Sequence, residues 1–483
     1  MCIHIYTYNH CALILKGKER LDNTVHFHKT FIMVWQFLKH LTQSDSILQS
    51  LRPLAYISLI GLAPFRLSVS KEVTTSAFSL AAGILHFFFY VLCFFLSLRE
   101  GDSIISYFFQ TSVTRLGDAT LSLSGIIAMV MIFSSIFFKR NLLLTIIQNC
   151  LVVDGIFLRL GLKLDYRKIL MYSFVTSLGL LLFNFVYLLV SYMLLRSAEI
   201  WPSFVVFTTF ALPHLNISIM VFKFLCTTHL TRTRFRMMNA VLQDILDSCI
   251  EERDAVELSP MHSVIHLHST NNITSRHAPS VIKPTATPRT RYSVTSLVRR
   301  NPEGALKQVS NVHNLLCDIC CTIEDYFNYP MLAIIAISFL FILFDDFYIL
   351  EAVITPSRVD KFEADEFFAF FITQMLWYVV IILLIVEGSS KTIKESNKTA
   401  AIVHKILNIS EESAVHDRLL RLSLQLSHRR VVFTAAGLFN LDRTLIFTIC
   451  GAATCYLIIL IQFRYNPAHW DRLNTSSGTV LAS

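Results

Sequence analysis

Residues 367–386 read FFAFFITQMLWYVVIILLIV, a stretch of twenty residues with no charged side chain. A helix rises about 1.5 Å per residue, so about 20 apolar residues cross the roughly 30 Å of hydrocarbon in a bilayer. Lipid offers the backbone no hydrogen-bond partner, and a helix satisfies its N–H and C=O groups internally. This stretch therefore predicts a membrane-spanning helix.

Further stretches of similar length and composition occur at residues 75–98, 119–138, 169–195, 202–226, 328–350 and 444–463. The whole chain is 54% hydrophobic and only 16% charged, whereas soluble domains contain about 25% charged residues. The apolar runs do not alternate with polar residues, which excludes a β-barrel. The sequence therefore predicts an all-α membrane protein with seven transmembrane helices.

The distribution of Lys and Arg predicts the orientation of these helices. Residues 1–74 and the connections after the second, fourth and sixth predicted helices hold 34 of the 42 basic residues, and the opposite side holds 7. Without the long connection after the fourth helix, the ratio is still 23 to 7. Because basic loops stay cytoplasmic, we expect a cytoplasmic N-terminus and an extracellular C-terminus, the reverse of a receptor coupled to G proteins.

The predicted helices also define the organisation of the chain. It comprises a cytoplasmic N-terminal segment (1–74), helices 1–4 (75–226), cytoplasmic helical extensions (227–327), helices 5–6 (328–386), cytoplasmic helices (387–443), helix 7 (444–463) and an extracellular tail (464–483). Residues 51–67 are too short to cross and are interrupted by Arg and Pro, so we expect a helix on the membrane face or under the bundle. Residues 259–301 are rich in Ser, Thr, Pro and His, which predicts a flexible insert.

The sequence carries no pattern typical of catalysis or metal binding. Its 11 cysteines all lie in predicted spans or cytoplasmic segments, where disulfides are rare. Cys317, Cys320 and Cys321 lack the second pair of ligands that a zinc site needs, so we expect them to be packing residues. We expect neither an enzyme nor a cofactor. The basic residues follow the membrane topology, so no nucleic-acid partner is expected either.

The C-terminal region carries the most specific motifs. They are RLSLQLSHRR at 421–430, FTAAGLFNLD at 433–442, GAATCY at 451–456 and YLIILIQF at 456–463. These motifs resemble the insect gustatory receptor family, whose seventh helix carries Thr-Tyr, five hydrophobic residues and Gln-Phe. Tyr456, Gln462 and Phe463 match this signature, whereas Cys455 replaces its Thr. LRPL at 51–54, GLAPF at 61–65 and RFRMMN at 234–239 extend the resemblance over most of the chain.

The resemblance implies a ligand-gated, non-selective cation channel in the plasma membrane of sensory neurons. It implies a homotetramer, which co-receptor subunits can join, with the seventh helices lining the pore and the cytoplasmic helices forming an anchor. The permeants would be monovalent and divalent cations, and membrane lipid would surround the assembly. The C-terminal motifs and the sixth helix are most similar to the fructose-receptor branch, which implies gating by a small sugar or polyol, with fructose first.

Other functions remain open at this stage. A channel of the same family gated by bitter compounds is the main alternative, and a metabotropic seven-helix receptor is another. A solute carrier is disfavoured, because the sequence shows no internal repeat and Pro213 is its one mid-span proline.

Three residues of the seventh helix are candidates for the pore: Tyr456, Gln462 and Phe463. A lone amide in lipid is costly unless it finds a partner or faces water. Gln462 can therefore line a pore or bond a neighbouring helix, and the resemblance favours the pore. A ring of Phe463 side chains can close such a path by dewetting.

Polar side chains inside the other predicted helices are candidates for ligand contact. They are Gln374 and Trp377, Asp345 and Asp346, and the mid-depth residues Asn184, His214 and Asn216. Gln374 and Trp377 share a helix face, and an indole beside an amide suits a sugar. A carboxylate near the outer end of the fifth helix can accept two hydroxyl hydrogen bonds. Alternatively, these groups bond one another across helices and contact no ligand.

Overall fold

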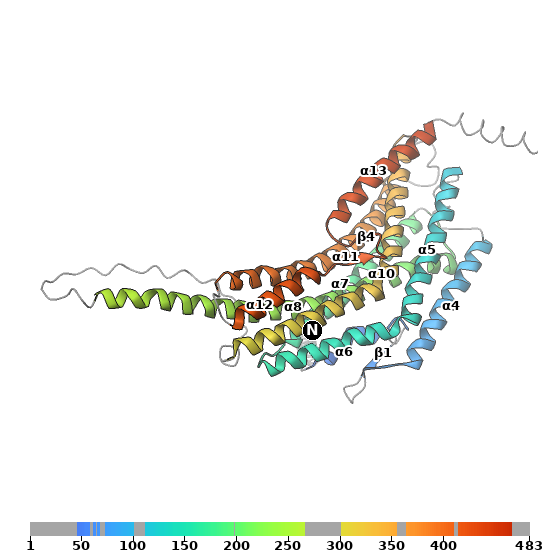
Figure 1. The fold of residues 1–483 in the computed structure, drawn as a ribbon. Coiled ribbons are helices and arrows are strands. Elements are labelled where there is room, and N and C mark those ends of the chain that lie inside the picture. Colours follow the sequence, from blue (N-terminus) through green and yellow to red (C-terminus); the bar gives the residue numbers. More distant parts are fainter. Residues whose placement is uncertain are drawn as a thin grey trace, which may run out of the picture. The chain divides into compact units, whose positions relative to one another are not determined.

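The protein is described by a computed structural model over residues 46–57, 61–63, 65–67, 73–100, 112–197, 199–265, 301–354, 364–409 and 414–465. Its helices are α2 (Ile47–Ser50), α3 (Arg52–Ile57), α4 (Ala77–Glu100), α5 (Ser112–Phe138), α6 (Arg140–Arg159), α7 (Tyr166–Ser197), α8 (Phe204–Ile265), α10 (Pro302–Ile354), α11 (Ala364–Leu407), α12 (Ala414–His428) and α13 (Thr444–Tyr465) (Figure 1). Its strands form two antiparallel hairpins, β1 (Phe65–Leu67) with β2 (Val73–Thr75) and β3 (Thr434–Ala435) with β4 (Phe439–Asn440). The described chain is therefore almost entirely helical, as predicted.

The chain divides into two compact units. The smaller unit consists of Met1–Pro53 and Asp165–Val175, and it contains α2 and the first turns of α7. Within it, Ser46 Oγ accepts a hydrogen bond from the backbone N–H of Gln49 at 3.4 Å and so caps α2. The sites described below lie within the larger unit.

Every predicted span falls in a helix of the structure. By length and hydropathy, seven helices of the described chain can cross a membrane, namely α4, α6, α7, α8, α10, α11 and α13. α5, where we placed the second crossing, has a shorter described apolar stretch, Ser122–Phe138. α6, which we placed in a cytoplasmic connection, packs against α8 and α10. One face of α6, which includes Leu143, Ile147 and Phe157, is therefore buried by protein, and hydropathy alone does not distinguish this from burial in lipid.

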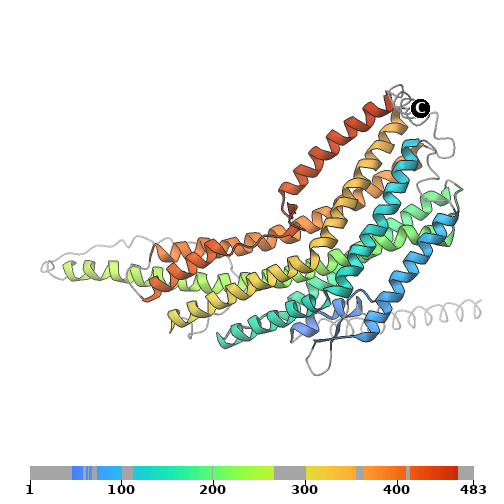
Figure 2. The same ribbon diagram turned by 45° about the vertical axis from the view of Figure 1, so that its right-hand side comes forward.

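α8, α10 and α11 are much longer than a bilayer is thick. They contain 62, 53 and 44 residues, which correspond to about 93, 80 and 66 Å of helix, whereas the hydrocarbon is about 30 Å thick. The three helices lie side by side and continue together beyond the predicted spans (Figures 1 and 2). α8 extends to Ile265, seven residues into the predicted flexible insert, and the rest of that insert lies outside the described residues.

The α5–α6 pair and α10 change direction where they touch each other. The break between α5 and α6 falls at Lys139, and α10 carries Pro330 inside the helix (Figure 2). Proline removes a backbone hydrogen bond and kinks a helix. The Lys139 ammonium donates to Asn328 Oδ1 at 3.1 Å and lies 4.7 Å from the centre of the Tyr329 ring. These contacts join the two bends.

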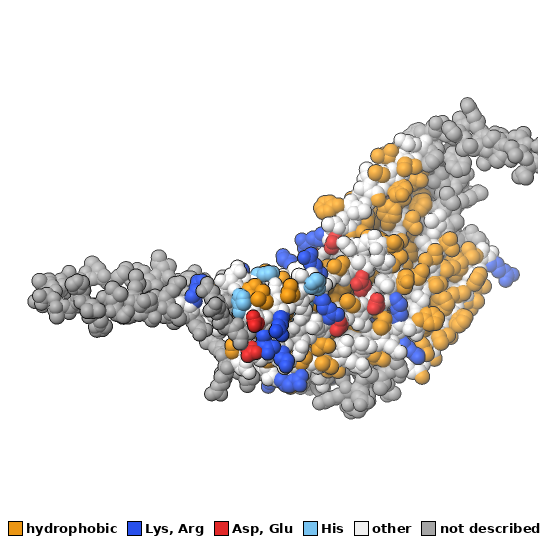
Figure 3. All heavy atoms as spheres, in the orientation of Figure 1, with side chains coloured by type: hydrophobic (Ala, Val, Ile, Leu, Met, Phe, Trp, Pro, Cys, Tyr) orange, Lys and Arg blue, Asp and Glu red, His pale blue; other side chains and the backbone are white. Residues whose placement is uncertain are grey.

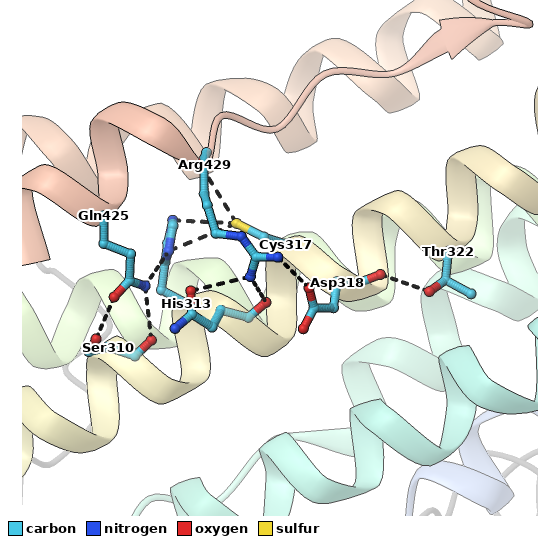
Figure 4. A network of polar contacts seen from close by, with 8 residues as sticks. Ser310, His313, Cys317, Asp318, Thr322, Gln425 and Arg429 are labelled. Carbon is cyan, nitrogen blue, oxygen red and sulfur yellow. Dashed lines mark hydrogen bonds and ion pairs between the residues drawn. The ribbon is translucent and has the colours of Figure 1, made fainter.

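Outside the predicted spans, polar contacts hold α12 on α10 (Figure 4). Gln425 Oε1 accepts from Ser310 Oγ at 2.6 Å, and Gln425 Nε2 donates to His313 Nδ1 at 3.1 Å. Arg429 pairs with Asp318 at 2.8 Å. Burial, together with the charge of Arg429, lowers the pKa of His313 to about 4. The imidazole is therefore neutral near pH 7 and able to accept the bond from Gln425.

A buried ion pair joins α6 to α8. Arg234 Nε donates to Asp154 Oδ1 at 2.9 Å, and its NH2 group donates to Asp154 Oδ2 at 2.6 Å. The Arg234 side chain is 0% exposed and that of Asp154 is 8% exposed. A buried pair is tolerated only with good geometry and with its remaining donors satisfied. Arg234 meets this condition, since NH1 donates to the Leu230 carbonyl at 2.9 Å.

The segment before α4 packs into the bundle. Gly61 has a φ of +79°, and a Cβ added there would lie 2.0 Å from the backbone N of Gly83, so the close approach to α4 requires glycine. The Leu62 carbonyl accepts a hydrogen bond from Lys223 Nζ at 2.9 Å. We expected residues 51–67 to form a helix, either on the membrane face or under the bundle. The helix there is short, α3 (Arg52–Ile57), and the described part from Gly61 is not helical but packs against α4 and α8.

The β3–β4 hairpin connects α12 to α13 and is held by both long neighbours. The backbone N–H of Thr434 donates to Glu324 of α10 at 3.2 Å. Ser389 of α11 donates to the Leu441 carbonyl. The start of α13 is thereby attached to α10 and α11.

Breaking the Asp154–Arg234 pair should destabilise the fold. Asp154→Asn leaves the guanidinium buried without its counter-charge, and loss of one partner of a buried pair costs about 3–5 kcal/mol. We expect a lower melting temperature in detergent, measured by size-exclusion chromatography after heating. Asp165→Asn, which removes the exposed pair with Lys168 at 3.1 Å, is the matched control and leaves the melt unchanged. Equal melts for both variants would contradict a structural role for the buried pair.

Candidate ligand-binding site

An aromatic cluster joins α7, α8, α10 and α11 inside the bundle. Its six rings belong to Tyr187, Phe210, His214, Phe341, Trp377 and Tyr378. The ring centres of His214 and Trp377 are 4.6 Å apart, those of Tyr187 and Trp377 are 5.6 Å apart, and Phe341 stacks on Tyr378 at 4.4 Å. Contacts of this kind stabilise a packed wall beyond the burial of its area.

His214 is the polar centre of this cluster. Its Nδ1 lies 2.7 Å from the Phe210 carbonyl, which can only accept, so Nδ1 carries the proton. Nε2 is then the acceptor and faces two hydroxyl donors, Tyr187 at 3.3 Å and Tyr378 at 3.1 Å. His214 therefore connects α7, α8 and α11, and its ring nitrogens are already partnered.

Ring contacts set the register of the antiparallel helices α10 and α11. Phe341 meets Tyr378 at 4.4 Å, and Tyr348 meets Phe371 at 5.3 Å. Asp345 lies between the two rings of α10, and Gln374 lies between the two rings of α11. The register thus places Asp345 opposite Gln374.

Asp345, Gln374 and Trp377 are fully buried, but their polar atoms are unpartnered. Both oxygens of Asp345, both polar atoms of Gln374 and Nε1 of Trp377 have no hydrogen-bond partner among the described residues. Their exposed fractions are 0%, 0% and 1%. More than about 90% of buried polar groups are hydrogen-bonded, because an unpaired one is costly. A ligand with its own donors and acceptors would supply the missing partners of these three groups, which lie on the facing helices α10 and α11.

The structure brings one further predicted residue to the edge of this site. Asn184 of α7 is buried one turn from Tyr187, and its Oδ1 accepts from Ser218 Oγ of α8 at 3.4 Å. The pair belongs to the same α7–α8 seam as His214. Asn184 therefore lies near the aromatic cluster, although its oxygen already has a partner.

Two predicted residues do not join the site. Asn216 faces α4, because its Nδ2 donates to the Leu212 carbonyl at 2.9 Å and lies 3.3 Å from His86 Nε2. Asp346 follows Asp345 on α10 and is turned from it by about 100° around the helix. The two carboxylates therefore cannot both face Gln374.

The predicted pore residues lie on α13, of whose most apolar window only 11% is buried. Tyr456 is 52% exposed, and the edge of its ring meets Phe339 of α10 at 6.1 Å. Gln462 is exposed, and the side chain of Phe463 is not among those described. The outward faces of α13 thus contact nothing within this chain's described residues, and their place in a pore stays a prediction.

The sequence analysis missed the aromatic wall itself. Tyr187, Phe210, Phe341 and Tyr378 all contact another member of the cluster, but they occur in a chain with 39 Phe and 16 Tyr. Aromatic residues at helical spacing are therefore too common to mark a site. The hydroxyls of the two tyrosines, which are polar groups inside spans, were the available signal.

Comparison with known sequences places this chain in a family. The profile described as "7tm Chemosensory receptor" matches residues 51–467. The chain is 64% identical over 457 residues to "Putative gustatory receptor 28a" of Drosophila melanogaster, covering 93% of this chain and 99% of that protein. It is 33% identical over 442 residues to "Putative gustatory receptor 28b" of the same species, covering 90% and 89%.

Comparison with solved structures identifies the same fold. The insect olfactory receptor OR5 from Machilis hrabei, in complex with eugenol, aligns with a TM-score of 0.53 at 11% identity, covering 86% of this chain and 100% of that one. The fold is thus that of a multi-pass chemosensory receptor. The chain belongs to the insect gustatory receptor family, as its C-terminal motifs predicted, and its relatives are receptors rather than enzymes.

Replacing Gln374 should not weaken the unliganded fold. Gln374→Leu removes an amide that has no partner to lose, so the melting temperature should stay the same or rise. The matched control is Asn239→Leu. Asn239 is a buried amide that donates to the Glu395 carbonyl at 2.8 Å and accepts from Thr399 at 2.7 Å. Its loss should cost about 1–3 kcal/mol. A larger loss at Gln374 than at Asn239 would contradict the unpartnered state.

Proposed function

We propose that this gustatory receptor is a ligand-gated, non-selective cation channel in the plasma membrane of sensory neurons. Four copies would assemble around an axis lined by α13, with Tyr456, Gln462 and Phe463 in or near the gate. The low burial of α13 supports this, because a membrane helix with largely uncovered faces has room for partners of the same kind. The solved structure of the same fold, an olfactory receptor in complex with eugenol, supports the binding of a small molecule.

The ligand we propose is a small sugar or polyol, with fructose the first to test. The observation that carries this proposal is the set of unpartnered groups at Asp345, Gln374 and Trp377. A carboxylate accepts from two hydroxyls, an amide offers one acceptor and two donors, and the indole N–H donates. The ring faces of the cluster can stack against C–H groups of the same molecule. Ligand sites usually combine an apolar wall with a few convergent polar groups in this way.

A bitter compound gating the same channel is the second candidate. The six rings of the aromatic cluster favour it, since they offer planar molecules more stacking surface than a monosaccharide uses. The two candidates differ in their dependence on Asp345. A hydroxyl-rich ligand needs the carboxylate, whereas a largely apolar ligand leaves it unpaired.

Asp345→Asn should weaken the response to the sugar. Loss of a hydrogen bond to a charged group costs about 1.5–3 kcal/mol, so the half-maximal concentration should rise about 10- to 150-fold. The measurement is whole-cell current in cells that express this chain alone, with surface labelling to confirm equal expression. Asp346→Asn, on another face of α10, is the control with little effect. Currents evoked by bitter alkaloids and by no sugar would overturn the ligand assignment.

Gln462→Ala and Phe463→Ala should alter conduction or leak without changing surface expression. Removing an amide or a ring from a narrow pore changes hydration of the path. Excised patches without nucleotides test this directly, because ligand-evoked unitary steps there distinguish a channel from a metabotropic receptor or a carrier. Unchanged unitary currents in both variants would remove these residues from the gate.

A further inference from the structure

A groove of about 300 Å³ lies between α10, α13 and the end of the β3–β4 hairpin. One end is lined by polar groups of Asn440, Thr444 and Thr448, and the other by Phe339, Ala452 and Tyr456. None of the residues that line it belongs to the ligand site described above. Figure 3 shows hydrophobic side chains over the neighbouring surface of α13.

The length of the groove matches one leaflet of a bilayer. From Thr444 to Tyr456, α13 rises about 18 Å, and one leaflet contributes about 15 Å of hydrocarbon. The polar end lies at the start of α13, which the predicted topology places at the cytoplasmic face. The groove therefore changes from polar to apolar in the direction in which a lipid of the inner leaflet does.

Two occupants are conceivable for this groove, a helix of a second copy and a single lipid chain. The groove is open along one side, so its volume of about 300 Å³ does not limit an occupant that lies partly outside it. The change in lining favours the lipid chain, because a lipid changes from polar to apolar in the same direction, whereas a membrane-spanning helix is apolar along its length.

A basic residue adjoins the polar end of the groove in the sequence. Arg443 directly precedes the groove, and its side chain is 71% exposed. One nitrogen, NH2, pairs with Glu387 Oε2 at 3.1 Å, so the guanidinium is held in place while its exposed side faces outward. Guanidinium groups bind phosphate through several donors at once.

We propose that one acyl chain of an inner-leaflet phospholipid occupies this groove, with its phosphate beside Arg443. The chain lies against Phe339 and Tyr456, and the polar end of the groove meets the glycerol region. This binding does not require channel activity. Its consequence for gating rests on the proposed function: if α13 lines the pore, the lipid chain packs between that helix and α10.

The experiment uses the full-length receptor in phosphatidylcholine nanodiscs that contain a small fraction of phosphatidylcholine with a diazirine in one acyl chain. After illumination, mass spectrometry maps the labelled residues. We expect labels on α10 around Phe339 and on α13 between Thr448 and Tyr456. Ala452→Trp fills the groove and should lower this labelling about ten-fold, which corresponds to excluding about two methylene groups from it.

Ala453→Trp is the matched control, because Ala453 is the next residue on α13 and does not line the groove. It should leave the labelling unchanged. Ala336→Trp on the opposite wall, at an exposed position that tolerates a larger side chain, repeats the test if Ala452→Trp folds poorly. Equal labelling in the groove-filling and control variants overturns the proposal. The proposal is also overturned if a photo-reactive amino acid at position 452 cross-links to another copy of this chain. A receptor that takes up the lipid label but answers no ligand refutes the proposed function alone.

Discussion

The hydrocarbon of a bilayer supplies no hydrogen bonds, and this constraint determines how polar groups are arranged in this chain. Each polar side chain inside a helix must find a partner within the protein or meet a ligand or water. Lys223 meets the constraint by donating to the Leu62 carbonyl, and both ring nitrogens of His214 are partnered. Most polar groups of the bundle are therefore structural, and their presence in a span does not by itself indicate a site.

Against that background, the unpartnered groups at Asp345, Gln374 and Trp377 are informative. The contact between α6 and α8 shows that the chain can satisfy buried charge where it needs to, since Arg234 and Asp154 pair with two hydrogen bonds between 2.6 and 2.9 Å. The unpaired groups at α10 and α11 therefore reduce the stability of the fold, and the fold does not require them. A protein retains such a cost at a functional site.

The helices were predictable from sequence because length and the absence of charge suffice to define a membrane span. The site was only partly predictable, since a helix that is apolar on all sides carries no information about which face meets which neighbour. Asn184 and Asn216 have the same chemistry and similar depth, yet one faces the aromatic cluster and the other faces α4. The pairing of Asp345 with Gln374 depends on the register of α10 against α11, which tertiary packing sets. α6 is long and apolar enough to span a membrane, but its placement in a cytoplasmic connection stays a prediction, because hydropathy does not distinguish burial in protein from burial in lipid.

The same two helices that carry the unpartnered groups also contact α13, at its start and at Tyr456. On α10, Phe339 lies six residues from Asp345 and meets Tyr456 far along α13, at 6.1 Å. On α11, Glu387 pairs with Arg443 at the start of α13, at 3.1 Å. A ligand that bridges Asp345 and Gln374 favours one spacing of α10 and α11 over another. α10 lies along α13 from Thr444 to Tyr456, whereas α11 is attached at its start, so under the proposed function a change in that spacing would alter the support of α13 unequally along its length. A ligand shifts an equilibrium between two conformations only through contacts that differ between them. Under the proposed channel function, the ligand's bridge from α10 to α11 is such a contact.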